Sequence, residues 1–169
     1  PGSATPTSRS FTFPGPGSLS LKSSGAASTA QAGFAQINVD SGSTAPSGIA
    51  VFAYRAHNVL VSEAGVPAAP LMTSGRTYAE VNADGTVNTG IAIANPGTQP
   101  ATIRFYITDS AGVDSTFRSI TLPAGGQIAR FLTETPFNSG FNVLGSFSFS
   151  SDNPISVIAL RGLTNQRSE

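Results

Sequence analysis

The sequence of 169 residues contains no cysteine and no tryptophan, a single methionine and a single histidine, and few charges. Without cysteine, disulfides and thiolate metal sites are excluded. The 9 basic side chains balance the 9 acidic ones and Lys22 is the single lysine, so no surface of clustered cations for nucleic acid or an anionic membrane is expected. No apolar run approaches the roughly 18 residues of a transmembrane helix, and we expect no membrane insertion.

Apolar and polar residues instead alternate with a period of two along most of the chain. Ile103, Phe105 and Ile107, for example, are separated by polar residues, which is typical of a half-buried strand. Turn signals such as Asp84-Gly85 divide such segments at intervals of about 8–12 residues. The pattern predicts an all-β protein, an antiparallel β-sandwich with little or no helix.

The turn spacing predicts five strands in the first part of the chain and seven or eight in the second. The expected strands are 9–13, 18–23, 33–39, 48–55 and 58–63, then 77–82, 87–94, 101–108, 115–122, 127–132, 144–150, 154–161 and, as an eighth, 165–169. Three stretches, 49–54, 90–94 and 155–160, are apolar on both faces, so we expect central strands covered on both sides.

Two parts of the chain resemble each other in sequence. Residues 9–14 match 118–123, residues 33–40 align with 145–152, and residues 49–63 align without a gap on 155–169, where six of fifteen residues are identical. Chance would give roughly one such identity, so the sequence predicts an internal repeat. In this repeat residues 8–63 duplicate residues 117–169, and residues 73–116 have no counterpart.

The repeat suggests a domain organisation. We expect a flexible lead-in at 1–7 (with 1–3 as a tag remnant on an excised piece of a longer protein), a smaller β subdomain at 8–63, a proline-containing connector at 64–72 and a β-sandwich subdomain at 73–169. Either the subdomains lie in series or the smaller half docks on the larger one. Five strands with few large side chains make a poor independent core, which favours two related subdomains sharing a substantial interface.

Two pairs of opposite charges recur at matching places in the repeat. Arg55 and Glu63 are eight residues apart, as are Arg161 and Glu169. Across a hairpin this spacing can make the two residues cross-strand neighbours. The sequence therefore predicts a structural ion pair in each copy that fixes the register of the hairpin, whereas the alternative is two unrelated exposed charges.

Three stretches, 75–96 (with Asn-Thr-Gly-Ile-Ala-Ile-Ala-Asn-Pro), 123–132 (Pro-Ala-Gly-Gly-Gln-Ile-Ala-Arg-Phe-Leu) and 157–169 (Val-Ile-Ala-Leu-Arg-Gly-Leu), resemble a repeated module of large secreted or cell-surface proteins of soil bacteria. Residues 52–67 resemble the same modules. The resemblance implies an extracellular β-sandwich array, and it supplies no activity, cofactor or functional residue to carry over.

The candidate catalytic residues lack the partner residues and motifs that catalysis requires. His57, beside a predicted turn, could serve Ser62 as a base, but no Gly-x-Ser-x-Gly motif exists and the matching position in the second copy is Leu163. Glu63, Glu80 and Glu134 could supply paired carboxylates, but they fall on separate predicted elements. We therefore predict a turn histidine, ordinary surface carboxylates, no catalytic residues and no enzyme.

Ligand sites are equally sparse. Residues 80–85 and 109–114 offer clustered oxygens for Ca²⁺, but neither matches the spacing of a calcium loop, so no metal site or cofactor is predicted. Carbohydrate surfaces usually offer an aromatic platform, whereas this chain has only Tyr54, Tyr78 and Tyr106 and phenylalanines on predicted core faces. Of these, Tyr106 beside Arg104 is expected to be partly exposed.

Three functional hypotheses follow. The leading one is a non-catalytic structural or adhesive module of a bacterial extracellular or cell-surface protein, monomeric in isolation, acting as a rigid spacer or interaction unit. The alternative is a polysaccharide- or protein-binding module appended to a secreted enzyme. A third is strand exchange between copies, because the first half lacks counterparts of residues 73–116 and could leave a sheet edge exposed.

Overall fold

The computed structural model describes residues 8–23, 33–57 and 59–164. In these residues every regular element is a β-strand, every strand pairing is antiparallel and no helix occurs, which confirms the predicted all-β antiparallel class. Accordingly, no helix that could span a membrane occurs in this part of the chain. The chain divides into two compact units, Pro1–Ala35 and Gln36–Glu169. The expected strand 165–169 lies outside the described residues.

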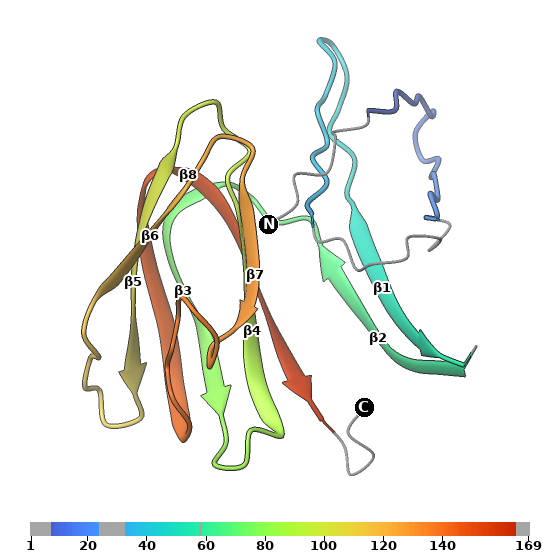
Figure 1. Ribbon diagram of the computed structural model, residues 1–169. Helices are drawn as coiled ribbons and strands as arrows, with labels where there is room; N and C mark the ends of the chain where they lie inside the picture. Colours follow the sequence, from blue (N-terminus) through green and yellow to red (C-terminus); the bar gives the residue numbers. More distant parts are fainter. Residues whose placement is uncertain (1–7, 24–32, 58, 165–169) are drawn as a thin grey trace. The chain divides into compact units, whose positions relative to one another are not determined.

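Most of the regular structure is one six-stranded antiparallel sheet in the order β6-β5-β8-β3-β4-β7 (Figure 1). Its strands are β3 (Met72–Val81), β4 (Val87–Ala94), β5 (Ala101–Asp109), β6 (Arg118–Leu122), β7 (Gln127–Phe131) and β8 (Val143–Leu163). These bounds agree closely with the expected strands 87–94, 101–108 and 127–132. The expected strand 115–122 begins only at Arg118, and the expected strand 77–82 begins earlier, at Met72.

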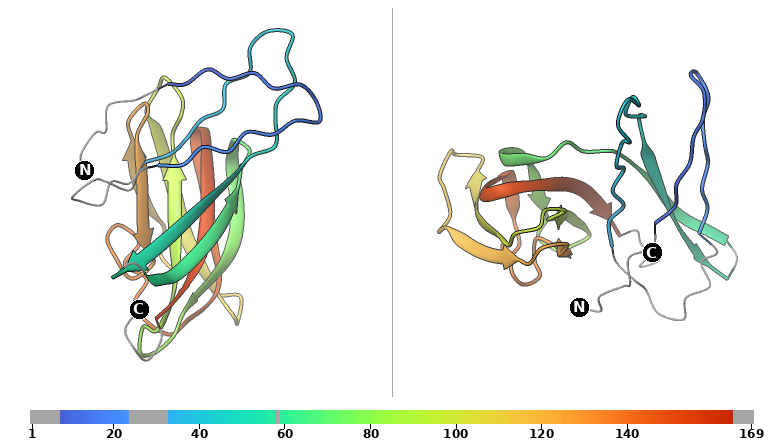
Figure 2. Two further views of the ribbon diagram at one scale, coloured as in Figure 1. Left: turned by 90° about the vertical axis from the view of Figure 1, so that its right-hand side faces the viewer. Right: turned by 90° about the horizontal axis from the view of Figure 1, so that it is seen from above.

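The 21-residue strand β8 holds the sheet together. Its first part, up to Ser151, pairs with both β3 and β5, and its second part, from Ser156, pairs with β4. Because one strand belongs to both sides, the sheet curls around a single interior, as seen from above in Figure 2. The two layers are therefore one continuous sheet.

The expected turn at Asp152-Asn153-Pro154 is instead a bend within β8. The carboxylate of Asp152 accepts a hydrogen bond from the amide of Thr102, and the side-chain amide of Asn153 donates to the carbonyl of Pro100. These bonds fasten the bend to the start of β5. The sequence predicted two strands, 144–150 and 154–161, because it shows the turn residues but not the neighbouring strands that keep the chain extended on both sides.

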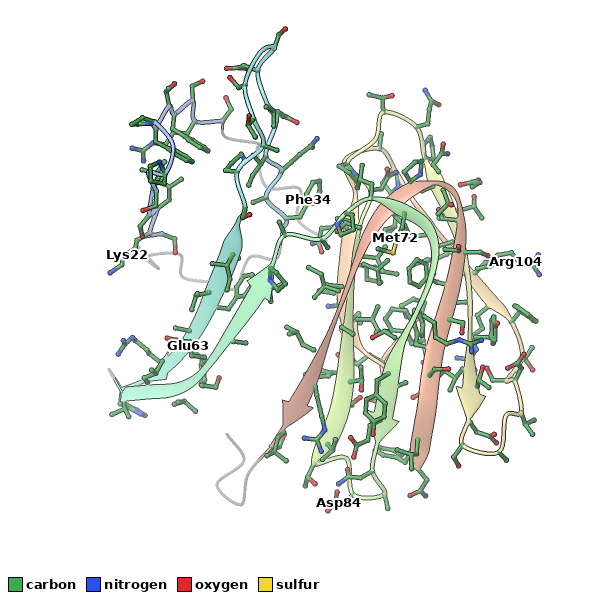
Figure 3. The ribbon with its side chains drawn as sticks, turned by 180° about the vertical axis from the view of Figure 1, so that it is seen from behind. Lys22, Phe34, Glu63, Met72, Asp84 and Arg104 are labelled. Carbon is green, nitrogen blue, oxygen red and sulfur yellow. The ribbon has the colours of Figure 1, made fainter. Side chains whose placement is uncertain are left out.

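The core lies between the two sides of the curled sheet, where side chains fill the interior (Figure 3). Ile91 comes from β4, Ile103 and Phe105 from β5 and Phe147 from β8, and all are almost fully buried. The rings of Phe105 and Phe147 also contact Phe137 from the β7–β8 connection, with centroids 5.2 and 5.5 Å from it. The period of two thus selects the inward residues of these strands.

Residues before β3 form a second, two-stranded sheet of β1 (Ile49–Ala56) and β2 (Val59–Pro67). His57, with φ of 48°, lies in the turn between them. Because β2 continues to Pro67, the expected connector 64–72 is shorter than predicted. The expected strands 9–13, 18–23 and 33–39 do not form, and the side chains of the described residues 8–23 and 33–48 are mostly exposed.

Two glycines at matching positions of the predicted repeat allow a controlled test of packing. A Cβ on Gly145 would lie 1.9 Å from the carbonyl oxygen of Thr108 in β5, whereas Gly33 has no atom within 4 Å of the corresponding position. We expect Gly145→Ala to destabilise the protein by about 3 kcal/mol, since β8 and β5 must separate, and Gly33→Ala to change it by less than about 0.5 kcal/mol. Thermal unfolding followed by circular dichroism measures both, and equal effects would contradict the described packing.

Candidate functional site

The outer face of β3, β8 and β5 carries a line of small polar side chains in its middle strand. Because Phe147 and Phe149 point into the core, Ser146, Ser148 and Ser150 of β8 point to the opposite face. The neighbours of Ser148, Arg76 on β3 and Tyr106 on β5, are longer, which leaves a shallow hollow of about 520 Å³ over Ser148 and Ser150. We call this hollow the serine groove. It is lined by Ser74, Gly75, Arg76, Tyr106, Phe117, Ser148, Phe149 and Ser150.

Hydrogen bonds and ring contacts fix the walls of the serine groove. Arg76 of β3 lies opposite Ser148, and its Nε donates to the Ser148 hydroxyl at 2.8 Å, while its Nη2 lies 3.5 Å from the hydroxyl of Tyr106. The Tyr106 ring packs against Phe117 with centroids 4.6 Å apart. The Arg104 guanidinium lies 5.4 Å from the Phe117 ring, a cation–π distance.

The serine groove is cationic. No acidic residue lines it, and the one ion pair among the described residues is formed elsewhere, so neither Arg76 in its wall nor Arg104 beside it forms an ion pair. Arg104 extends away from the sheet into solvent (Figure 3). The groove therefore combines the guanidinium group of Arg76, hydroxyl groups and an aromatic wall, of which Phe117 is 54% exposed. The guanidinium group of Arg104 lies beside this wall, outside the lining of the groove.

Sequence reasoning anticipated only part of this groove. Tyr106 is half-buried next to Arg104, close to what the alternation of β5 predicted. Phe117 was missed, because it fell within the expected strand 115–122 and the phenylalanines were assigned to core faces, whereas β6 begins only at Arg118. Arg76 was missed as well, since the expected strand 77–82 began after it. Tyr54 and Tyr78 are both exposed, but neither lines the groove.

A second polar cluster joins β3 to the far end of β8. Arg161 Nε donates to a Glu80 carboxylate oxygen at 2.8 Å, and the Tyr78 hydroxyl donates to the same oxygen at 3.2 Å. The hydrogen bond from Arg161 lowers the pKa of Glu80, and desolvation together with the bond to Glu80 raises the pKa of Tyr78. Since the β3–β4 ladder consists of one residue pair, Val81 with Asn88, this ion pair helps to hold that side of the sheet.

The structure revises the predicted ion pairs. Arg161 pairs with Glu80, and Glu169 lies outside the described residues. In the β1–β2 hairpin Glu63 lies opposite Ala53, whereas Arg55 lies opposite Leu60, because the register shifts after Tyr54. Arg55 and Glu63 are therefore not directly opposite each other, and the one ion pair among the described residues is that of Arg161 with Glu80. The shift in register could not be read from the spacing of the two residues.

The residues considered for catalysis are not brought together. His57 is exposed in its turn and makes no hydrogen bond to Ser62, which lies opposite Tyr54 on β2. Glu134 accepts a hydrogen bond from the Phe131 amide at 2.7 Å and so closes the turn after β7. In residues 8–23, 33–57 and 59–164 no three His, Cys, Asp or Glu side chains gather in a way that could hold a metal ion.

The acidic residues considered for calcium bind their own turns. Asp109 accepts hydrogen bonds from the amides of Ala111 and Val113, both at 2.9 Å. Asp114 accepts one from the Thr108 hydroxyl at 2.7 Å. In the other segment, Asp84 at the tip of the β3–β4 turn (Figure 3) accepts from the amide and hydroxyl of Thr86, which lowers the Asp84 pKa. In both segments these carboxylates stabilise turns.

Comparison of the chain with protein-family models, with curated proteins and with solved structures finds no match. The arguments about function therefore depend on the residues themselves.

The Glu80–Arg161 pair predicts a specific pH dependence. A carboxyl pKa that is lower in the folded protein contributes stability above its ordinary value of 4.5, and this contribution is lost as the pH falls through the lowered pKa. We expect Glu80→Gln to lower the Tm modestly at pH 7, with the difference from the parent protein shrinking below pH 4. Thermal unfolding between pH 3 and pH 7 measures this, with Glu63→Gln as a control that removes an exposed carboxyl without an ion-pair partner. A difference independent of pH would contradict the assignment.

Proposed function

We propose that the chain is a non-catalytic structural or adhesive module of a bacterial extracellular or cell-surface protein, which acts as a rigid spacer or interaction unit. The observation that carries this proposal is that the polar side chains hydrogen-bond to the loops and bends of their own sheet. Asp109 and Asp114 hold the loop after β5, and Asp152 and Asn153 hold the bend of β8. The carboxylate and amide side chains of these segments therefore stabilise loops and bends next to the strands.

The side chain of Asn95 is the clearest example of a polar side chain that stabilises a turn. It is fully buried at the end of β4, and its amide nitrogen donates to the carbonyls of Gln99, Leu122 and Pro123 at 2.8–3.1 Å. Its oxygen accepts from the amide of Gly97 at 3.0 Å. One side chain thus ties the β4–β5 turn to the end of β6. A buried amide satisfied in this way restricts the relative motion of the strands it joins, which is what a spacer requires.

The sequence supports the same proposal. Low charge, the absence of oxidisable cysteine and the resemblance to modules that follow one another in secreted proteins all suit an extracellular array. In such an array, weak contacts made by each module add up to avidity.

Light scattering combined with a glycan array tests this proposal. For a spacer we expect a monomer at all concentrations and no retention of any glycan. Retention of a glycan by the intact chain would refute the spacer function and favour a binding module.

The serine groove favours a second candidate, the binding of an acidic polysaccharide. Arg76, which lines the groove, and Arg104, which lies beside its Phe117 wall, form no ion pair, so an anionic sugar could supply the missing partner. The Phe117 ring offers an apolar face against which a sugar ring can stack, and the serine hydroxyls offer hydrogen bonds.

This candidate makes its own prediction. If a uronic-acid polymer is retained, we expect Arg76→Ala and Phe117→Ala each to weaken binding about tenfold and 0.5 M salt to abolish it, because exposed charge pairs are screened. Affinity electrophoresis in gels containing the polymer measures the effect. Arg130→Ala, which removes an exposed arginine outside the groove, serves as the control; an equal loss in that variant would show that binding does not depend on the groove.

A further inference from the structure

Large apolar side chains are exposed throughout the described part of residues 8–67. The exposed ones are Phe11, Leu19, Leu21, Phe34, Ile37, Val39, Ile49, Val51, Phe52, Tyr54, Val59 and Leu60. Many of them recur at every second residue, as Leu19 and Leu21 or Ile37 and Val39 do, which is the pattern of a strand with one face in a core. Exposed apolar side chains in this number indicate a surface that a partner covers.

The predicted repeat allows the exposure of these side chains to be compared with that of the aligned residues in the second copy. Ile155 is 0% exposed, whereas Ile49, the residue aligned with it, is 70% exposed. Phe149 is 6% exposed, whereas Ile37 at the aligned position is 45% exposed. The local turn is nevertheless the same in both copies, because the Gly17 amide donates to the Pro14 carbonyl as the Gly126 amide does to Pro123. The copies thus differ in burial while sharing this turn.

In the second copy the ladder hydrogen bonds of the strands are made with three other strands. β6 pairs only with β5, β7 pairs only with β4, and β8 pairs only with β3, β4 and β5. β6, β7 and β8 do not pair with one another. All their partners therefore lie in residues 72–109, the part of the chain for which the first copy has no counterpart.

The dependence of β6, β7 and β8 on strands from residues 72–109 explains the structure of the described residues 8–23 and 33–56. The segments aligned with β6, β7 and the first part of β8 have no ladder partner and form no strand, although their alternation is that of strands. The segment aligned with the second part of β8 forms β1, which pairs with β2 instead. An isolated two-stranded hairpin is marginally stable at best, so further strands would stabilise it.

We propose that the described segments 8–23 and 33–56 are an acceptor for a three-stranded antiparallel segment with the chemistry of β3–β5. The occupant would supply three strands whose inward face is apolar, like Val81, Ile91 and Ile103, and would complete a second curled sheet by strand addition. A second folded copy of this chain is not the occupant, because its own β3–β5 are already held within the same molecule by β6–β8. The inference applies to a spacer and to a binding module alike.

A fusion variant of the full chain tests the proposal. An additional copy of residues 72–116 is placed directly before Ser8, in the way that residues 72–116 precede Phe117. We expect amide hydrogen exchange in residues 9–56 to slow by a factor of about 100 or more relative to the parent chain, because these amides acquire ladder partners. Amides of the original residues 72–163 show in the same sample whether the native sheet remains folded.

Two matched controls use the same readout. Ile49→Asp should abolish the new protection in the fusion variant, yet leave the Tm of the parent chain unchanged, because Ile49 is 70% exposed there. Aspartate at the positions of Ile103 and Phe105 in the added copy alone should also abolish the new protection, since the donated strand then has no apolar face.

Two outcomes would overturn the proposal. One is a fusion variant in which residues 9–56 exchange as fast as in the parent chain while the native sheet stays protected. The other is concentration-dependent protection of residues 9–56 in the parent chain, which would assign this surface to a second copy.

Discussion

The structure depends on the pairing of one strand with three others. β8 bonds to β3 and β5 along its first part and to β4 along its second, so a single bent strand connects both sides of the sheet. Gly145 permits the close approach of β8 to β5, and Asp152 fastens the bend to the beginning of β5. The core forms because this bend turns both parts of the sheet towards the same aromatic cluster.

The same geometry creates the polar outer face. Alternation along β8 places phenylalanines inside and serines outside, and the longer residues of β3 and β5 then rise on both sides of the serines. The serine groove is thus a consequence of core packing, to which Arg76, Arg104 and Phe117 add charge and an aromatic surface. Elsewhere Asp84, Asp109 and Asp114 stabilise turns and loops, and Glu80 forms an ion pair with Arg161.

The sequence predicts the elements better than their partners. Alternation identified β4, β5 and β7 almost to the residue, and Asp84-Gly85 correctly marked the turn between β3 and β4, where φ of Gly85 is 74°. The turn predicted at Pro154 was wrong, because neighbouring strands keep β8 extended through these turn-forming residues. Alternation also predicted strands in residues 9–23 and 33–39 that do not form, because a strand pattern does not say whether a partner strand is present. The Glu80–Arg161 pair joins residues 81 positions apart, and no local spacing could reveal it.

Native-state hydrogen exchange of the parent chain, measured residue by residue, tests the central claim most directly. If β8 is held in place by its pairing with β3, β4 and β5, amides in the middle of β8 exchange only through global unfolding. Amides of residues 9–22 and 34–40, whose sequence carries the same alternation, should exchange at rates close to those of an unfolded peptide. Comparable protection in both parts would show that residues 9–40 find partners of their own, and would contradict the account.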